Sequence, residues 1–203
     1  MLTLQGRVAL VTGGSRGIGR AVAVLFGRLG ARVALSYVHD EEAARTAVAE
    51  IGTEALALRA DLAQPAAADR LVAETLDVFG QLDILVVNHG IWKRASLLEM
   101  TEEQWQETLD VNLTGAWAVC RAAARVMAPR RSGTMVLMAS TAGQRGEAHY
   151  SHYAAAKGAA IAFTRSLAAE LAPLSIRVNG VAPGWVVTDM TRQVLEGPDA
   201  AAA

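Results

Sequence analysis

The sequence predicts an α/β fold: a doubly wound parallel β-sheet with helices on both faces. Short apolar runs rich in Val, Leu and Ile alternate with longer helical patterns along the chain. Continuous apolar runs are typical of parallel strands that are buried on both faces, and regular strand–helix alternation implies right-handed crossovers. We expect one domain over residues 1–203.

Each predicted strand is a short apolar run bounded by Gly or polar residues. In chain order the runs are RVALVT, ARVALSY, ALALRA, LDILVVN, GTMVLMAS and LSIRVNGVAP, at 7–12, 31–37, 55–60, 82–88, 133–140 and 174–183. In such sheets a ligand binds at the carboxyl ends of the strands. Functional residues are therefore expected directly after these runs.

The helices are predicted between the strands, at 17–30, 40–51, 65–80, 103–130 and 153–172. Pro65 suits the first turn of a helix, with Asp61 and Gln64 as candidate caps. Thr101 and Gln104 have the spacing of a capping box, which predicts a helix start there.

Composition excludes several classes of protein. Nineteen basic and 20 acidic residues give a net charge of -1, so nothing predicts a nucleic-acid or anionic-membrane partner. The apolar runs fall far below the ~20 residues of a membrane span, and we read no signal peptide at the N-terminus. Cys120 lies in an Ala-rich helical pattern and is interpreted as a buried, inert thiol, which fits a cytoplasmic location. His149 and His152 have no acids at metal spacing, so no metal site is expected.

A glycine turn follows the first strand and opens the first helix. Gly13, Gly17 and Gly19 are spaced G-x-x-x-G-x-G, with Ser15 and Ile18 between them. Glycines allow a tight turn and the close approach of a pyrophosphate, which the free N–H groups of a helix N-terminus can bind. An ordinary glycine-rich turn is the alternative, but the strand before and the helix after favour a Rossmann-type dinucleotide site.

The end of the second strand indicates which dinucleotide binds. An acid there would bond the ribose 2′-OH of NAD, but the strand ends with Ser36 and Tyr37, and the first acid is Asp40. Arg16, inside the glycine turn, could pair with a 2′-phosphate, although a solvated Arg is the alternative. The sequence therefore favours NADP(H), with NAD(H) as the second choice.

An ordered set of motifs runs from residue 7 to about residue 192 and comprises Thr12-Gly13-x-x-x-Gly17-x-Gly19, Asp61, Asn88-His89-Gly90, Asn112, Ser140, Tyr153-x-x-x-Lys157, Pro183-Gly184 and Thr188. This set resembles the short-chain dehydrogenase/reductase (SDR) family, most closely its 3-oxoacyl-[acyl-carrier-protein] reductase branch. Each motif alone is weak, but the ordered set is specific. The resemblance implies an NADP(H)-dependent oxidoreductase that interconverts a carbonyl and a secondary alcohol.

The chemistry of this family needs a Tyr whose proton can be exchanged. Tyr153 and Lys157 are one helical turn apart and share a face, and Lys157 is one of only two lysines in the chain. The ammonium of Lys157, together with the positive nicotinamide ring, could lower the Tyr pKa of about 10 toward neutrality. By resemblance, Tyr153 is the general acid–base, Ser140 orients the substrate oxygen, and Asn112 holds a water that links Lys157 to solvent. A plain strand-end Ser and a surface Asn are the alternatives for Ser140 and Asn112.

The resemblance also implies cofactor contacts outside the glycine turn. Asp61 would accept a hydrogen bond from adenine, with a helix cap as the rival role, and Tyr153 and Lys157 would contact the nicotinamide ribose. The remaining implied contacts are Tyr37, Leu62, Asn88, Gly90, Pro183, Gly184 and Thr188.

Departures from the family pattern leave the substrate open. His89 stands where Ala is usual and is interpreted as a tolerated variant, while His149 and His152 are expected in solvent or at the substrate entrance. Arg130 and Arg131 fit a basic surface near the active-site mouth for an acidic carrier, whereas Leu174 does not.

The expected reaction is reduction of a 3-oxoacyl thioester, free or carrier-bound, by a homodimer or homotetramer. An SDR alcohol, sugar or steroid dehydrogenase and a truncated, non-catalytic dinucleotide-binding protein are the alternatives. By resemblance, family members usually run several dozen residues longer than this chain, in which a last strand and a substrate lid are not evident.

Overall fold

The protein is built on one parallel β-sheet in the computed structural model, which describes residues 2–197. Its strands are β1 (Val8–Val11), β2 (Arg32–Tyr37), β3 (Ala55–Arg59), β4 (Ile84–Val87), β5 (Gly133–Met138) and β6 (Ile176–Val181). They pair in the order β3-β2-β1-β4-β5-β6, and every pair is parallel. The chain thus winds outward in both directions from β1, which confirms the predicted doubly wound sheet.

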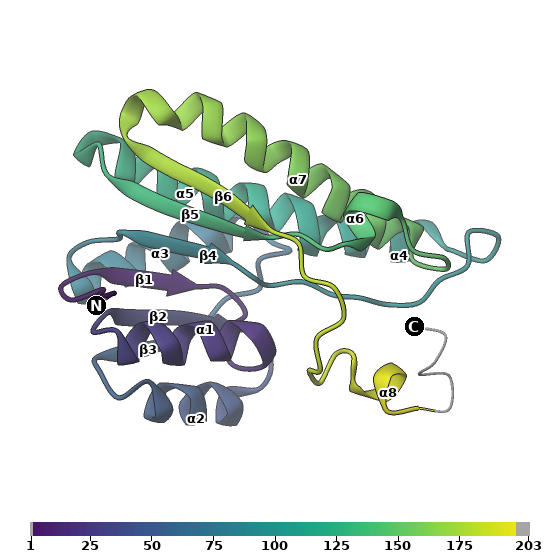
Figure 1. Ribbon diagram of the computed structural model, residues 1–203, viewed down its shortest axis with the longest axis horizontal. Coiled ribbons are helices and arrows are strands. Elements are labelled where there is room, and N and C mark those ends of the chain that lie inside the picture. Colours follow the sequence, from purple (N-terminus) through teal and green to yellow (C-terminus); the bar gives the residue numbers. More distant parts are fainter. Residues whose placement is uncertain (1, 198–203) are drawn as a thin grey trace.

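Helices form a layer on each face of the sheet (Figure 1). Helices α1 (Gly17–Arg28) and α2 (Glu41–Ile51) cover one face, over a core that includes Val33, Leu35 and Ile51. The other face carries α3 (Pro65–Phe79), α5 (Gly115–Arg130) and α7 (Ser151–Leu171).

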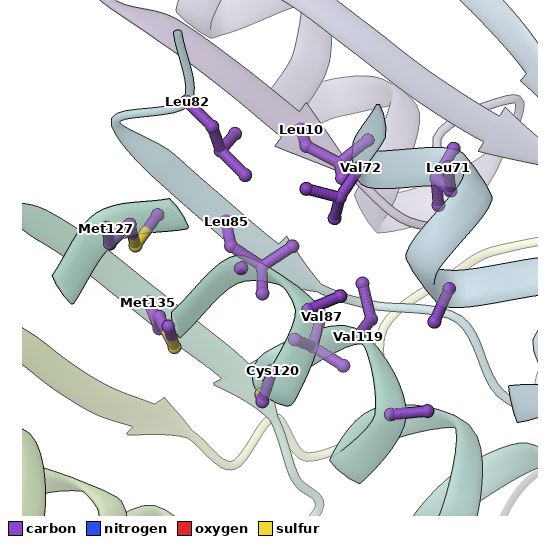
Figure 2. Close-up of a cluster of buried hydrophobic side chains, with 14 of the residues drawn as sticks. Leu10, Leu71, Val72, Leu82, Leu85, Val87, Val119, Cys120, Met127 and Met135 are labelled. Atoms are coloured by element: carbon purple, nitrogen blue, oxygen red, sulfur yellow. The ribbon is translucent and has the colours of Figure 1, made fainter. Parts of the chain in front are cut away.

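The core under α3 and α5 is formed by aliphatic and sulfur-containing side chains. Figure 2 shows Leu85 and Val87 of β4 beside Val119 and Cys120 of α5. Burial raises the pKa of the Cys120 thiol to about 12, and its side chain is 2% exposed. The interpretation of Cys120 as a buried, inert thiol is therefore confirmed.

Local signals start several helices where they were predicted. The capping box of Thr101 and Gln104 is formed in both directions, and Pro65 occupies the first turn of α3. Asp40 caps α2 by accepting from the backbone N–H of Ala43 at 2.8 Å. Gln64 makes no capping bond with its side chain, whereas Asp61 accepts from the N–H of Ala63 in the preceding turn.

The predicted helix 103–130 is divided into three parts. Helix α4 (Glu102–Leu109) passes through one π-helical turn, η1 (Asp110–Thr114), into α5. The predicted helix 153–172 is followed by a 3-10 turn, η2 (Ala172–Leu174). The short helices α6 (Ala142–Arg145) and α8 (Arg192–Leu195) were not predicted, because four residues are too few to show a periodic pattern.

The expectation that every strand is buried on both faces is wrong for β6. Ile176 and Val178 are buried, but Arg177 and Asn179 between them are exposed. β6 is one of the two edge strands, and the described helices pack on one of its faces, so its other face meets solvent. The other edge strand, β3, is only half-buried, and Arg59 at its end is exposed. Among residues 2–197, no helix combines the length and apolarity that crossing a membrane requires.

Candidate active site

A cleft of about 680 Å³ lies along the carboxyl ends of the strands. It brings together sixteen of the predicted site residues, which are Gly13, Ser15, Arg16, Gly17, Ile18, Tyr37, Asp61, Leu62, Asn88, Gly90, Ser140, Tyr153, Lys157, Pro183, Gly184 and Thr188. Gly19 and Asn112 lie directly behind its wall, against Asn88 and Gly90 respectively. Motifs spread over most of the chain therefore converge on one surface.

The glycine turn between β1 and α1 has a backbone that only glycine adopts readily. Gly13 and Gly17 have φ angles of 62° and 55°. The N–H of Gly13 is 3.2 Å from the Ser36 hydroxyl oxygen, which ties the turn to the end of β2. The segment after β6 passes close to this turn, and a Cβ at Gly17 would lie 3.4 Å from Cγ2 of Thr188 (Figure 1). The turn thus leaves backbone surface open at the N-terminus of α1, where a pyrophosphate can approach.

Replacing Gly19 with Ala is expected to lower the free energy of unfolding by about 1–3 kcal/mol and to weaken dinucleotide binding. The added Cβ would press on the Gly13 carbonyl and lie 2.5 Å from Nδ2 of Asn88. Urea unfolding and a fluorescence titration with NADPH measure the two effects. Gly180→Ala is the matched control, because its Cβ would meet ordinary contacts of 3.4 Å or more. Equal effects of the two substitutions would contradict the prediction.

Asn88 fixes the glycine turn to the end of β4. Its Nδ2 group donates to the carbonyl oxygens of Thr12 and Gly13, both at 3.1 Å. Its backbone N–H donates to the Thr12 hydroxyl at 2.9 Å. The side chain of Asn88 therefore helps to fix the shape of the cleft, which Asn88 also lines.

His89 is half-buried in the wall of the cleft. Its Nδ1 lies 2.7 Å from the Thr12 hydroxyl, and its Nε2 is buried without a well-formed hydrogen bond among the described residues. Burial, together with the charge of Lys157, lowers the pKa of His89 to about 3, although the Val111 backbone acts in the opposite direction. His89 is therefore neutral at physiological pH.

Ser140, Tyr153 and Lys157 form a compact group at the ends of β5 and α7. Lys157 is 6% exposed and donates from Nζ to the Met138 carbonyl at 2.8 Å. The same Nζ lies 5.7 Å from the centroid of the Tyr153 ring. The Ser140 hydroxyl accepts from the N–H of Ala142 at 3.1 Å and hydrogen-bonds Tyr153. A carbonyl oxygen placed beside Tyr153 could accept from both hydroxyls.

The protein's own groups raise the pKa of Tyr153. Burial has the largest effect, the Ser140 hydrogen bond lowers the pKa, and the charge of Glu147 raises it. Burial also lowers the pKa of Lys157 to about 8. The lowering of the Tyr153 pKa expected from its Lys partner would therefore require the positive nicotinamide ring as well. A protonated Tyr153 is the form that a general acid in carbonyl reduction needs.

Asn112 lies in the π-helical turn and is 2% exposed. Its Oδ1 accepts from the N–H of Ile91, and its Nδ2 donates to the Ile91 carbonyl, both at 2.9 Å. This pair of bonds holds the loop after β4 against the helix that faces Lys157. The surface alternative for Asn112 is wrong, and its role in holding a water stays a prediction.

The adenosine end of the cleft contains the residues predicted to select the cofactor. Arg16 and Tyr37 line it together with Asp61 and Leu62. The nearest acid after β2, Asp40, is engaged as the cap of α2.

The expectations for Arg130, Arg131 and His152 near the mouth are wrong, whereas His149 is exposed, as expected. Arg130 donates to the Leu82 carbonyl and to Asp83, and Arg131 donates to the Pro173 carbonyl. Helix α5 runs antiparallel to the strands, so its last turn lies at their amino ends, away from the cleft. His152 is 1% exposed rather than in solvent or at the entrance.

Four residues that were not predicted form a cluster at the start of α7, where Tyr150 lies three residues before Tyr153: Trp92, Glu147, Tyr150 and Trp185, which we call the rim cluster. Trp92 stacks on Tyr150, with ring centroids 4.4 Å apart, and meets Trp185 edge-on at 5.5 Å. Trp92 and Trp185 each follow a family motif shortly after a strand, and that position could have indicated that they lie near the reacting residues. Among residues 2–197, no three His, Cys, Asp or Glu side chains are grouped as a metal site would require.

Comparisons with known proteins agree with this geometry. Residues 7–199 match the short chain dehydrogenase family. A 3-oxoacyl-[acyl-carrier-protein] reductase of Synechocystis sp. is 41% identical over 98% of this chain and 81% of its own length. A sorbitol dehydrogenase of Cereibacter sphaeroides is 44% identical over 91% of this chain and 72% of its own length.

The solved structures agree as well. A short chain dehydrogenase of Burkholderia cenocepacia, solved in complex with NADP, has a TM-score of 0.91 and 41% identity over 98% of this chain and 81% of its own. With the six-stranded parallel sheet, the glycine turn and the Ser140–Tyr153–Lys157 group in place, the chain belongs to the short-chain dehydrogenase family.

Proposed function

We propose that this protein is an NADP(H)-dependent reductase that converts the 3-oxo group of an acyl thioester, carrier-bound or free, into a secondary alcohol. The observation that carries the proposal is the convergence of Ser140, Tyr153 and Lys157 in one cleft with the glycine turn. The cleft can take a dinucleotide along its length and leaves the reacting carbonyl beside Tyr153. The substrate class is supported by relatives named 3-oxoacyl-[acyl-carrier-protein] reductase.

In this proposal the protein positions the reactants and supplies a proton. The nicotinamide supplies the hydride when it is bound. Ser140 and Tyr153 hydrogen-bond the carbonyl oxygen, Tyr153 donates the proton to it, and Lys157 binds the nicotinamide ribose hydroxyls. Asn112 is proposed to hold the water through which Tyr153 recovers its proton by way of Lys157.

The preference for NADP(H) is supported by Arg16 and by the engagement of Asp40 as a helix cap. A guanidinium can pair with a 2′-phosphate, whereas a free carboxylate at the end of β2 would repel it. The relative solved with NADP adds to this support. The direct test is to follow reduced-nicotinamide absorbance with acetoacetyl thioester, with NADPH and then with NADH. Turnover with NADH alone would refute the cofactor assignment.

Arg16→Ala is expected to raise the KM for NADPH about tenfold and to change the KM for NADH by less than about threefold. Only NADPH carries the phosphate that Arg16 is proposed to bind. Arg28→Ala is the matched control, because Arg28 is an exposed arginine in the last turn of the same helix. An equal increase in the KM for NADPH and for NADH would instead indicate that Arg16 contacts the pyrophosphate, which both cofactors share.

A second candidate is a sugar-alcohol dehydrogenase, which is favoured by the 44% identity to a sorbitol dehydrogenase. The same residues would then work in the oxidative direction. Assays with sorbitol and NADP⁺ or NAD⁺, beside the thioester assay, separate the two candidates.

We further propose a cytoplasmic homodimer or homotetramer. Trp105 on α4 and Trp117 on α5 are 40% and 41% exposed, and large apolar side chains on the outer faces of helices support contact with a second copy. Light scattering of the purified protein, beside a Trp117→Glu variant, tests the assembly.

A further inference from the structure

The rim cluster has no part in the reaction described above, yet it is built from three separate segments. Trp92 belongs to the loop after β4, Glu147 and Tyr150 precede α7, and Trp185 follows β6. Figure 1 shows the loops before α4 and before α7 projecting from the same end of the sheet. Tyr150 is the N-cap of α7, so it lies less than one helical turn from Tyr153.

Glu147 is fixed within this cluster. The indole N–H of Trp92 donates to its Oε1 at 3.2 Å, and the Glu147 carbonyl accepts from the N–H of Tyr150, also at 3.2 Å. The stacking of Trp92 on Tyr150 fixes the direction of that indole N–H. The Glu147 carboxylate, which accepts this hydrogen bond from Trp92, retains capacity to accept more.

The charge of Glu147 reaches the reacting group. Glu147 raises the pKa of Tyr153, and it also raises that of Tyr150. Burial raises the pKa of Glu147 itself, against the Trp92 hydrogen bond and the charge of Arg145. Partial burial weakens solvent screening, so a negative group on a substrate at Tyr153 would experience the same field.

Positive groups also lie near the cluster. Arg145 lowers the pKa of Glu147 and Arg94 lowers that of Tyr150, and both arginines are exposed, whereas the charge that acts on Tyr153 is that of Glu147. Lys157 lies deeper, where its ammonium is bonded to the Met138 carbonyl.

We propose that Glu147 determines substrate specificity: its carboxylate, held on the rim by the indole N–H of Trp92, makes the site reject 3-oxo acids and accept neutral 3-oxo esters and thioesters. The substrate class rests on the proposed function, whereas the discrimination by charge is a property of the rim itself. A thioester meets this requirement because its acyl group has no charge beside the reacting carbonyl, while the corresponding free acid is an anion at neutral pH.

The test compares acetoacetate with ethyl acetoacetate, which share the 3-oxo group and differ in charge. Glu147→Gln is expected to raise kcat/KM for acetoacetate about tenfold and to change that for the ester by less than about twofold. Trp92→Phe keeps an aromatic ring but removes the indole N–H, so it should relax the discrimination by about threefold. Glu99→Gln removes an exposed charge from the same loop and is the control for a general effect of net charge.

A binding measurement keeps this test independent of turnover. In the Tyr153→Phe background with NADPH bound, tryptophan fluorescence gives dissociation constants for both compounds, with and without Glu147→Gln. The acid-to-ester ratio should fall about tenfold with the Gln variant. An unchanged ratio would overturn the role of Glu147, even in an active enzyme. No turnover of ester or thioester by the wild type would refute the proposed function, while a shift in the binding ratio would still support the charge discrimination.

Discussion

Tyr153→Phe is expected to lower kcat for carbonyl reduction by about 10³-fold while changing NADPH affinity by less than about threefold. The substitution removes the proposed proton donor and keeps the ring, which lies 5.7 Å from the Lys157 ammonium. Stopped-flow absorbance of NADPH measures the rate, and fluorescence titration measures the affinity.

The matched control is Tyr150→Phe, which removes a hydroxyl from the same helix terminus but not from the reacting position. We expect Tyr150→Phe to lower kcat by less than about fivefold. Equal losses in the two variants would show that a hydroxyl at Tyr153 has no special part in proton transfer.

The raised pKa of Tyr153 also predicts opposite pH profiles in the two directions. Reduction needs the protonated hydroxyl, so its rate should stay constant through neutral pH and fall only in alkali. Alcohol oxidation needs the phenolate and should speed up over that same alkaline range. Removing the Glu147 charge should move both profiles toward lower pH, because that charge raises the Tyr153 pKa.

Lys157→Met is expected to abolish turnover and yet to stabilise the fold by about 1–2 kcal/mol at pH 7. Burial lowers the pKa of Lys157 from 10.5 to about 8, which means that the charged form costs the folded state about 3 kcal/mol. The substitution also leaves the Met138 carbonyl without its hydrogen-bond donor, which costs about 1–2 kcal/mol and offsets part of this gain.

The destabilising effect of the buried Lys157 charge should depend on pH. The folded-state pKa lies below that of the unfolded chain, so the stability present above pH 10.5 is lost as the pH falls toward about 8. Urea unfolding at pH 7 and pH 10 should therefore show a rise in wild-type stability that the Met variant lacks. Lys93→Met is the control, because Lys93 is the only other lysine and forms an exposed pair with Glu107. A larger change in stability for Lys93→Met than for Lys157→Met would contradict the assignment of this effect to the buried Lys157.

Much of the fold could be predicted from local signals. The six apolar runs correspond to the six strands within two residues at each end, because a short continuous run rich in Val and Leu between turn residues is typical of a buried strand. Short stretches of sequence are also enough to recognise the glycine turn, the capping box at Thr101 and Pro65 in the first turn of its helix. The grouping of Tyr153 and Lys157 follows from helical periodicity alone.

Contacts between distant segments could not be predicted in this way. His89 has an ordinary local sequence, and it is half-buried only because β1, β4 and the π-helical turn meet around it. Arg130 was assigned to the mouth because its charge was visible, while its partner Asp83 is 47 residues away. The π-helical turn depends in the same way on Asn112 bonding to Ile91 of another segment.

The sequence by itself determined the class of fold and the order of its elements, because those depend on periodicity along the chain. Its resemblance to a family identified the residues that can carry the chemistry. The tertiary structure alone decided the electrostatics of the site. The lowered pKa values of Lys157 and His89 and the position of Glu147 against Trp92 come from burial and from partners brought together by folding. A side chain's pKa and orientation depend on what surrounds it in space, which no single segment specifies.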